Sequence, residues 1–541
     1  MRKIQHKLSA KTFSRKDLNM AGLLPVVRKS FEGVVPMRKL VAKQNSIPLV
    51  DCLTSGLAVF GIKAPSLLDF DKGRASETIT HNMRTLYEVK QVPSDTCLRQ
   101  RLDEVDPREL RIAHKNLFSC LQQTKLLREF EYIDGHYILS ADGTGYFSSS
   151  SVHCENCCVK RHGQCVVKLI AGDLNEIDGV KGKNPHYLLF KIPGKPWELV
   201  YRCKDEEDVL IPLTLAEGLL ERLGGKELKK LSAANKKEIQ ALIVAYHEAN
   251  HPELAVEYYH QMYCAAIVHP DKKTVIPFAP EPILKSDGSL KNDCERNASK
   301  RFFDDFRREH PNLKIIVVED GLASNIPHLE MLRLHNLRFI IGAKPGDHKS
   351  LFDSMQQLVD KKNSAYCEDV VKMPDGTICR YRYVNNIQLN DSDDEFFVNF
   401  LQYWETKPGG QPMSFSWVTD LKLTSDSVHR IMKTGRARWK IENETFNTLK
   451  NQGYHFEHNF GHGNQHLSSV FASLMILAFA LDQICEAADV LFQNVRKKLK
   501  QRVYMWKLMG GFFASCFINS WRDLYRALMG EGAAMLTFST A

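Results

Sequence analysis

The spacing of hydrophobic and polar positions predicts helices at both ends of the chain. Residues 1–130 show helical periodicity interrupted by turn signals, as in SIPLVDCLTSGLAVFGI, and Ser94 or Asp95 is placed to cap a helix in PSDTCLRQRLDEV. Near the other end, the apolar run SSVFASLMILAFAL (468–481) is too short to cross a bilayer comfortably and predicts a buried core helix.

Between these ends the pattern predicts a sheet. Short apolar runs recur in HYILSA, CAAIVHP and KTVIPFAP, and a helix expected at about 293–308 precedes the run LKIIVVEDG. This last run is continuously apolar and stops at an acid, as buried strands do at a functional sheet edge. The pattern therefore predicts an α/β core.

Two stretches differ from this core in their hydrophobic pattern and composition, and we interpret them as insertions. One spans 165–257 and mixes two strands with helices, and the other spans 345–430 and is rich in β-like runs around NDSDDE. The predicted organisation is a helical N-terminal region (1–130), the start of the core (131–164), an atypical inserted unit (165–257), the continuation of the core (258–344), a β-rich insertion (345–430), a functional helix with the end of the core (431–490), and a C-terminal helical region (491–541).

Composition limits the class of protein. The chain has 541 residues, of which 43% are hydrophobic and 25% charged, and its formal charge is +9. The basic runs MRKIQHKLSAKTFSRK and NVRKKLKQR would suit a phosphate backbone, although each could equally be a solvated face. Fourteen cysteines without a secretory signal indicate a reducing compartment, so we expect a cytoplasmic protein without a membrane partner.

The stretch RARWKIENETFNTLKN (436–451) predicts a helix with a carboxylate on its buried face. At 100° per residue, Glu442 falls inside the apolar stripe, whereas Glu444 points to the opposite side, toward solvent. A buried carboxylate is unfavourable unless a cation, a donor or a metal ion satisfies it. Arg438, one turn earlier, could do so as a simple ion pair, and a metal ion is the alternative. The residues expected to seat this helix are Trp439, Phe446 and Leu449.

Two predicted strands end in an aspartate. Asp142 follows YILSA and Asp320 follows KIIVVE, and each precedes a glycine, so each alone could be an ordinary turn. Together with Glu442, three carboxylates from two strands and a helix can hold two divalent ions, Mg²⁺ or Mn²⁺. That arrangement would serve phosphodiester chemistry.

The stretches ADGTGYF, VVEDGLASN and RARWKIENETFNTLK resemble the DDE transposases of bacterial insertion sequences, in the group with a Tyr-Arg-Glu-Lys signature. The resemblance covers most of residues 45–485 and implies an RNase H-like α/β core with a β-rich insertion. It implies that Asp142, Asp320 and Glu442 are the catalytic, metal-binding triad and that Arg438 is the signature arginine. It further implies double-stranded DNA as partner, namely terminal repeats and target, bound by the N-terminal region and basic patches of a homodimer.

The chain departs from this family pattern at three places. Gly435 stands where the signature tyrosine is expected, and the signature lysine falls on Leu449, which makes Lys450 a DNA-binding candidate one residue out of register. The 165–257 unit interrupts two neighbouring parts of a family hairpin, which could impair activity unless its ends lie close together. A catalytically inactive DNA-binding relative is therefore an alternative function.

The sequence HCENCCVKRH has metal-ligand spacing. Cys154, Cys157 and His162, with His260 further along, could form a structural zinc site, against the alternative that the thiols are merely buried or exposed. Cys158 and Cys165 are additional candidates. The later histidines lie among glycines that break regular spacing, which favours a loop near the active site or DNA over a metal site; they are His455, His458, His462 and His466.

One further motif suggests another class of enzyme. AYHEANHPEL contains His247, Glu248 and His251 in the H-E-x-x-H pattern of zinc proteases. Pro252 directly follows and disfavours helical geometry at His251. A solvated helix end is the preferred interpretation, and a zinc metalloprotease the minor alternative.

Overall fold

The computed structural model describes residues 12–37, 46–161, 170–172, 186–190, 198–202, 208–210, 256–287, 291–390, 395–531 and 537–538. The chain divides into two compact units. The first consists of Met1–Ser148, Val152–Cys158 and Tyr259–Ala541, and the second of Ser149–Ser151 and Val159–Tyr258. The second unit corresponds closely to the insertion predicted at 165–257. Its described strands form a sheet in the order β4 (Ile170–Gly172), β5 (His186–Phe190), β6 (Glu198–Arg202) and β7 (Asp208–Leu210).

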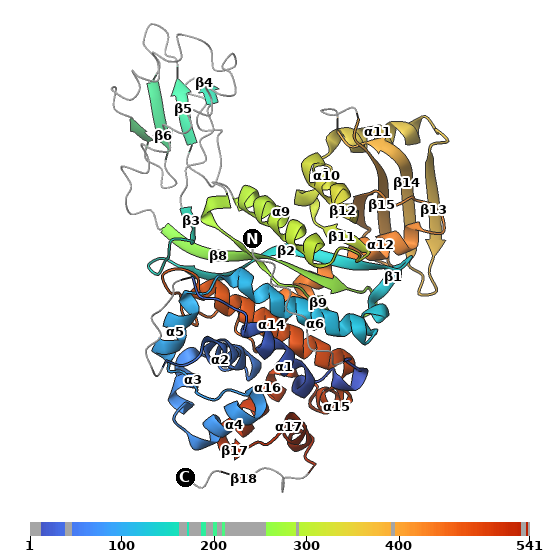
Figure 1. The fold of residues 1–541 in the computed structure, drawn as a ribbon. Coiled ribbons are helices and arrows are strands. Elements are labelled where there is room, and N and C mark those ends of the chain that lie inside the picture. Colours follow the sequence, from blue (N-terminus) through green and yellow to red (C-terminus); the bar gives the residue numbers. More distant parts are fainter. Residues whose placement is uncertain are drawn as a thin grey trace. The chain divides into compact units, whose positions relative to one another are not determined.

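Helices from the two ends of the chain pack together in the first unit (Figure 1). The N-terminal helices are α1 (Met20–Phe31), α2 (Leu49–Gly61), α3 (Leu67–Gly73), α4 (Glu77–Tyr87), α5 (Asp95–Asp103) and α6 (Arg111–Gln123), with short turns η1 (Arg15–Asp17), η2 (Pro107–Leu110) and η3 (Leu126–Phe130). The C-terminal helices are α14 (Leu467–Ala488), α15 (Val490–Leu499), α16 (Arg502–Ser515) and α17 (Trp521–Leu528), with the strand pair β17 (Cys516–Phe517) and β18 (Thr537–Phe538). Ser94 caps α5 by accepting from the backbone N–H of Cys97, as predicted.

α14 is the central helix of this layer and packs against α1, α2, α5 and α6. Among the described residues it is the helix with the length and hydropathy to cross a membrane, and 94% of its most apolar window is buried inside the protein. The predicted core helix is therefore confirmed.

The large sheet runs through the first unit in the order β10-β8-β2-β11-β12-β16-β15-β14-β13. β2 (His136–Ser149), β11 (Ile315–Glu319) and β12 (Arg338–Gly342) are mutually parallel neighbours, and β10 (Glu281–Ile283) is antiparallel to β8 (Val256–Val268). Short strands β1 (Glu131–Ile133) and β9 (Ile276–Pro277) pair with β2 and β8, and β3 (Cys158–Arg161) also pairs with β8. Continuous burial of β11 explains its unbroken apolar sequence.

Helices lie on both sides of the central strands (Figure 1). α9 (Lys291–Glu309) and α10 (Ile326–Leu334) lie on one side, and α6 and α14 on the other. The connections between them include η6 (Lys285–Asp287) and η7 (Gly321–Ala323). The protein is thus of the α/β class, with a mixed sheet, as the alternation of patterns predicts.

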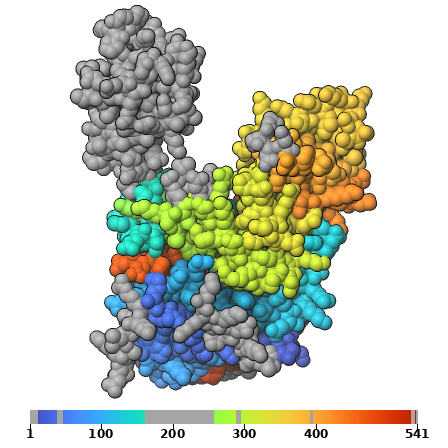
Figure 2. Space-filling view, turned by 45° about the horizontal axis from the view of Figure 1, so that its top comes forward, coloured from blue at the N-terminus to red at the C-terminus, as the bar shows by residue number. Residues whose placement is uncertain are grey.

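The β-rich stretch expected at 345–430 continues the same sheet. β16 (Met413–Thr419) pairs antiparallel with β12, and β15 (Phe397–Thr406), β14 (Ile378–Gln388) and β13 (Tyr366–Lys372) follow, with α11 (Lys349–Asp360) beside them. In the space-filling view, the yellow and orange surface of this stretch projects as a lobe (Figure 2).

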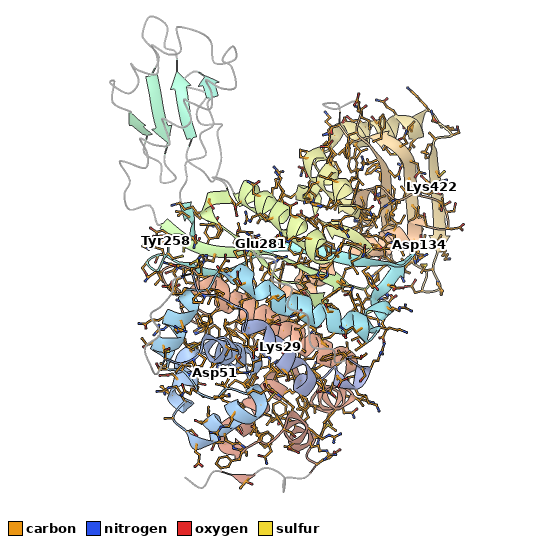
Figure 3. The ribbon with its side chains drawn as sticks, viewed as in Figure 1. Lys29, Asp51, Asp134, Tyr258, Glu281 and Lys422 are labelled. Atoms are coloured by element: carbon orange, nitrogen blue, oxygen red, sulfur yellow. The ribbon has the colours of Figure 1, made fainter. Side chains whose placement is uncertain are left out.

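Buried ion pairs fasten the helical layer to the sheet. Arg111 of α6 forms a two-pronged pair with Glu309 of α9, at 2.9 and 3.1 Å. Its guanidinium also lies 3.6 Å from Glu281 of β10, which is labelled in Figure 3 and accepts from Arg301 at 2.7 Å. Because Arg111 and Glu281 are buried, removing a partner of either would leave an unpaired charge in the interior.

Candidate active site and metal cluster

Parallel pairing of β2 and β11 brings the two predicted aspartates near each other. Asp320 follows the end of β11 as predicted, but Asp142 lies within β2, which continues to Ser149, so the prediction that a strand ends at Asp142 is wrong. The strands pair Ser140 with Val318, and Asp142 and Asp320 each follow two residues later. Asp320 caps η7 and accepts from the backbone N–H of Leu322 at 2.9 Å. Both aspartates line one small cavity together with Glu295 of α9.

The helical segment that carries Glu442 is irregular. α12 (Val428–Arg436) ends in a turn, a π-helical segment η8 (Ile441–Phe446) follows, and α13 (Asn447–Asn451) completes it. In a π-helix the hydrogen bonds span five residues, so angles calculated at 100° per residue do not hold. Such segments occur frequently at functional sites.

This irregularity corrects two predictions about side-chain direction. Trp439 was expected to seat the helix, but it is 52% exposed, whereas Phe446 and Leu449 are buried as predicted. Glu442 lies at the edge of the buried face, with its side chain 42% exposed, and Glu444 is partly buried. Glu442 is thus half-exposed and pairs with Arg438 instead of lying fully on the buried face.

Arg438 connects two carboxylates of the predicted triad. Its Nη1 donates to Glu442 Oε1 at 2.7 Å and lies 3.4 Å from Asp142 Oδ2. Ser140 of β2 also donates to the backbone carbonyl of Arg438 at 2.9 Å, which fixes the helix on the strand. The predicted i,i+4 pair therefore exists, and the same guanidinium reaches the sheet edge.

Burial and crowded negative charge raise the pKa of Asp142. Desolvation is the largest cause, followed by Glu295; Arg438 opposes them, and the resulting pKa is about 7. Asp320 and Glu442 make smaller contributions to this rise, so the three carboxylates interact electrostatically. A perturbed carboxylate in a cavity with further acids is typical of catalytic and metal-binding sites.

Glu295 belongs to this site although the sequence analysis did not single it out. A Cβ added at Gly143 would lie 2.7 Å from Glu295 Oε2, so Glu295 packs directly against the backbone next to Asp142. Its signal in the sequence is weak, because a glutamate in the charged helix DCERNASKRFFDDFRRE has no distinguishing pattern.

A second carboxylate missed by the sequence analysis is Glu319, the neighbour of Asp320. It is buried, accepts a hydrogen bond from the Tyr263 hydroxyl, and contacts His328 Nε2 at 2.7 Å. These contacts hold the end of β11 in place, which fixes where Asp320 emerges.

A larger cavity of about 610 Å³ opens beside Asp320 and Arg438. Its lining combines aromatic rings with cations, including Trp404, Phe415, Trp417, Trp439, Lys344 and Arg436. Phe415 and Trp417 are stacked at 5.9 Å between ring centroids, and Arg436 lies over Phe415. Aromatic faces and cations together suit the bases and phosphates of an unpaired nucleic-acid strand.

The structure gives a reason for Gly435 where the family resemblance predicts tyrosine. A Cβ at this position would lie 2.5 Å from Trp417 Nε1, so this chain fills the space from β16 instead. Lys450, the other doubtful position, forms an ion pair with Glu457 at 2.7 Å and keeps 27% of its side chain exposed.

A separate cluster brings together Cys154, Cys157, His260 and His462. Their ligand atoms all lie within 4.8 Å of one another, and three of the four residues are buried. The two sulfurs are 3.9 Å apart, and Cys157 Sγ lies 3.4 Å from His260 Nε2 and 3.3 Å from His462 Nε2. This cluster could hold a metal ion.

The cluster confirms part of the predicted ligand set and corrects another part. For His462 the sequence predicts a loop in preference to a metal site. It does lie in a loop, but the fold brings it beside Cys157 and into a cluster that could hold a metal ion. Cys158 is excluded from the cluster, since its thiol faces the carbonyl of Ile283. His162 and Cys165, together with His247, Glu248 and His251 of the protease-like motif, lie outside the described residues.

Comparison of the sequence with protein-family models and with curated proteins gives no match.

Proposed function

We propose that this protein is a DDE-type DNA transposase of an insertion sequence, which cleaves element ends and joins the freed 3′-hydroxyl to target DNA. The observation that carries the proposal is the electrostatic cluster of Asp142, Asp320 and Glu442, whose three carboxylates come from two parallel strands and an adjoining helix. The mixed α/β sheet is compatible with an RNase H-like core, which is the fold proposed here.

Asp142, Asp320 and Glu442 would hold Mg²⁺ or Mn²⁺, because hard divalent cations prefer carboxylate oxygens. Bound there, two such ions would supply activation of a water or 3′-hydroxyl and stabilisation of the leaving oxygen of the phosphodiester. In this arrangement Arg438 keeps Asp142 and Glu442 oriented toward each other, and its charge opposes the rise in the pKa of Asp142.

Surfaces around the triad support a DNA substrate. The aromatic and cationic cavity adjoins Asp320 and Arg438, so a strand placed for cleavage would pass these rings. Arg438 and Lys450 are the proposed DNA-binding residues of the helical segment, and double-stranded terminal repeats and target DNA are the proposed partners. We further propose that a homodimer acts in the cytoplasm at the nucleoid.

For the separate cluster we propose Zn²⁺. Zinc binds thiolates at about 2.3 Å and imidazoles at about 2.0–2.1 Å in tetrahedral geometry, which places ligand atoms about 3.3–3.8 Å apart. Four of the six pairs of ligand atoms are 3.3–3.9 Å apart, close to that requirement, and all lie within 4.8 Å. Soft sulfur ligands also select zinc over magnesium, so the two sites would hold different ions.

The test uses the full chain, Mg²⁺ and DNA that carries the terminal repeats of the element. The wild type should nick this DNA, and Asp142→Asn should lose nicking by roughly 10³-fold or more while still binding the repeats. Asp134→Asn is the matched control, because Asp134 is an exposed aspartate on the turn before β2.

The same assay distinguishes the alternative. A wild type that binds the repeats and never nicks them, with Mg²⁺ or Mn²⁺, would indicate a catalytically inactive DNA-binding protein and overturn the proposal. An Asp142→Asn variant that nicks as well as the wild type would exclude the triad as the catalytic centre.

A further inference from the structure

We propose that Zn²⁺ at Cys154, Cys157, His260 and His462 is a structural cross-link that closes the first unit at the two points where the chain enters and leaves the second unit. The inference rests on zinc as the ion proposed above for this cluster. It concerns architecture, and it needs neither DNA nor the carboxylate triad.

The ligands flank both chain crossings. Cys157 lies two residues before Val159, where the long segment of the second unit begins, and His260 lies two residues after Tyr258, where that segment ends. Their ligand atoms are nevertheless only 3.4 Å apart. The insertion therefore leaves and re-enters the first unit at almost the same place, which is the condition under which an insertion need not separate β2 from β8.

The fourth ligand, His462, connects these two chain crossings to a distant part of the chain. His462 lies in the loop between α13 and α14, 305 residues after Cys157. A bond across so long a loop removes much conformational freedom from the unfolded chain, as a disulfide does. The cross-link thus joins the loop after β2 and the strand β8 to the loop that follows the helical segment of Glu442.

Other contacts hold the same loop in position for the metal. Asp103 of α5 accepts backbone N–H groups from Asn464, Gln465, His466 and Leu467, and so caps the start of α14. Asn156, between the two cysteines, donates to the carbonyl of Gln465 at 3.0 Å. The loop is thereby fixed directly after His462.

The surroundings of the cluster favour a structural site over a catalytic one. Four protein ligands fill a tetrahedral shell, whereas catalytic zinc keeps one position for water or substrate. Aromatic rings cover the imidazoles: Phe147 lies 4.3 Å from His462 between ring centroids, and Tyr146 stacks on His260 at 5.8 Å. Tyr146 and Phe147 are both buried, and so are three of the four ligands, which would limit the access of water to a bound metal ion.

The experiment compares the wild type, His462→Gln and the control His458→Gln. His458 lies in the same loop, is exposed and is outside the cluster. Metal analysis should find about one zinc per chain in the wild type and the control and almost none in His462→Gln. Hydrogen exchange should rise about tenfold or more in residues 136–149, 259–268 and 452–466 of His462→Gln, and remain unchanged in β13–β15.

Stripping the wild type with a chelator and reloading it provides a second route if His462→Gln does not fold. Stripping should raise exchange in the same three segments, and added Zn²⁺ should reverse the change. Wild type that contains no zinc and gains no protection from added Zn²⁺ overturns the proposal. So does zinc loss that leaves exchange in these segments unchanged.

These measurements are made without DNA and without Mg²⁺. A failure to nick terminal-repeat DNA would therefore overturn only the proposed enzymatic function, and a failure of the exchange experiment only the zinc cross-link.

Discussion

Arg438 donates from Nη1 to Glu442 Oε1 at 2.7 Å, one turn further along the same helical segment. That nitrogen is also 3.4 Å from Asp142 Oδ2, so one guanidinium group spans the helix and the sheet edge. The side chain of Arg438 is only 16% exposed, and solvent screens these interactions less than it would at the surface.

Replacing Arg438 by Gln should impair the proposed cleavage more than it impairs folding. The variant loses the charge that opposes the raised pKa of Asp142 and the bond that orients Glu442. We expect a fall in the cleavage rate of roughly 10- to 100-fold at saturating Mg²⁺, and a smaller fall for Arg438→Lys, which keeps the charge.

The control for this prediction is Arg430→Gln, because Arg430 is a half-exposed arginine on α12 that donates to the carbonyl of Tyr132. Equal losses in the Arg430 and Arg438 variants would show that the helix is generally sensitive to substitution and that Arg438 has no specific role.

The raised pKa of Asp142 predicts that Mg²⁺ binding strengthens with rising pH. A protonated carboxyl must release its proton before it binds the ion, so affinity should increase through about pH 7. Because Glu295 is the largest electrostatic cause, Glu295→Gln should move this midpoint to lower pH. Calorimetric titration of Mg²⁺ at several pH values measures the shift.

The metal-free protein should show the opposite dependence in its stability. The pKa of Asp142 is 3.8 when unfolded and about 7 when folded, so the unfolded chain loses its proton first as pH rises. Stability from this group is therefore complete below about pH 4 and declines until about pH 7. Asp142→Asn should remove this decline in the free energy of unfolding. In the Mg²⁺ titration, a pH midpoint that does not move in Glu295→Gln would contradict Glu295 as the largest electrostatic cause of the raised pKa of Asp142.

His114, buried in α6, predicts a loss of stability in mild acid. Desolvation, aided by Arg111, lowers its pKa from 6.5 to about 3, so the unfolded chain takes up the proton first as pH falls. The contribution of His114 to the free energy of unfolding is therefore fully present above about pH 6.5 and falls at lower pH. At pH 5 it is smaller by roughly 2 kcal/mol.

Denaturant unfolding at pH 7.5 and pH 5 tests this prediction. His114→Leu should lose less stability than the wild type between the two pH values, whereas His458→Leu, on the surface, should behave like the wild type. An identical pH dependence in His114→Leu and the wild type would contradict it.

The sequence predicts this fold best where a short pattern determines burial. The unbroken apolar run of β11 and the long apolar run of α14 each specify an element that must be buried on every side, and both occur where expected. The hydrogen-bonding capacity of one side chain was enough to predict the start of α5, because Ser94 caps this helix.

The features that the sequence did not reveal depend on distant contacts or irregular geometry. His462 becomes a cluster residue only because the fold brings it beside Cys157, and no local spacing contains that information. The exposure of Trp439 follows from the turn and the π-helical segment near it, which regular helical periodicity cannot anticipate. Glu295 and Glu319 differ from ordinary charged residues only in their three-dimensional neighbours.

Trp439 and Trp417 line the same cavity but should respond differently to substitution. Trp439 is 52% exposed, so Trp439→Ala should leave the free energy of unfolding nearly unchanged and weaken DNA binding by about 1–3 kcal/mol if a base stacks on it. Trp417 is buried and stacks on Phe415, so Trp417→Ala should destabilise the protein by about 3–5 kcal/mol. Fluorescence anisotropy with terminal-repeat DNA bearing a short single-stranded end, together with denaturant unfolding, separates the two effects. Trp439→Ala that binds this DNA as tightly as the wild type would show that the exposed ring makes no contribution to DNA recognition, and would restrict the role of the cavity to its buried aromatic wall.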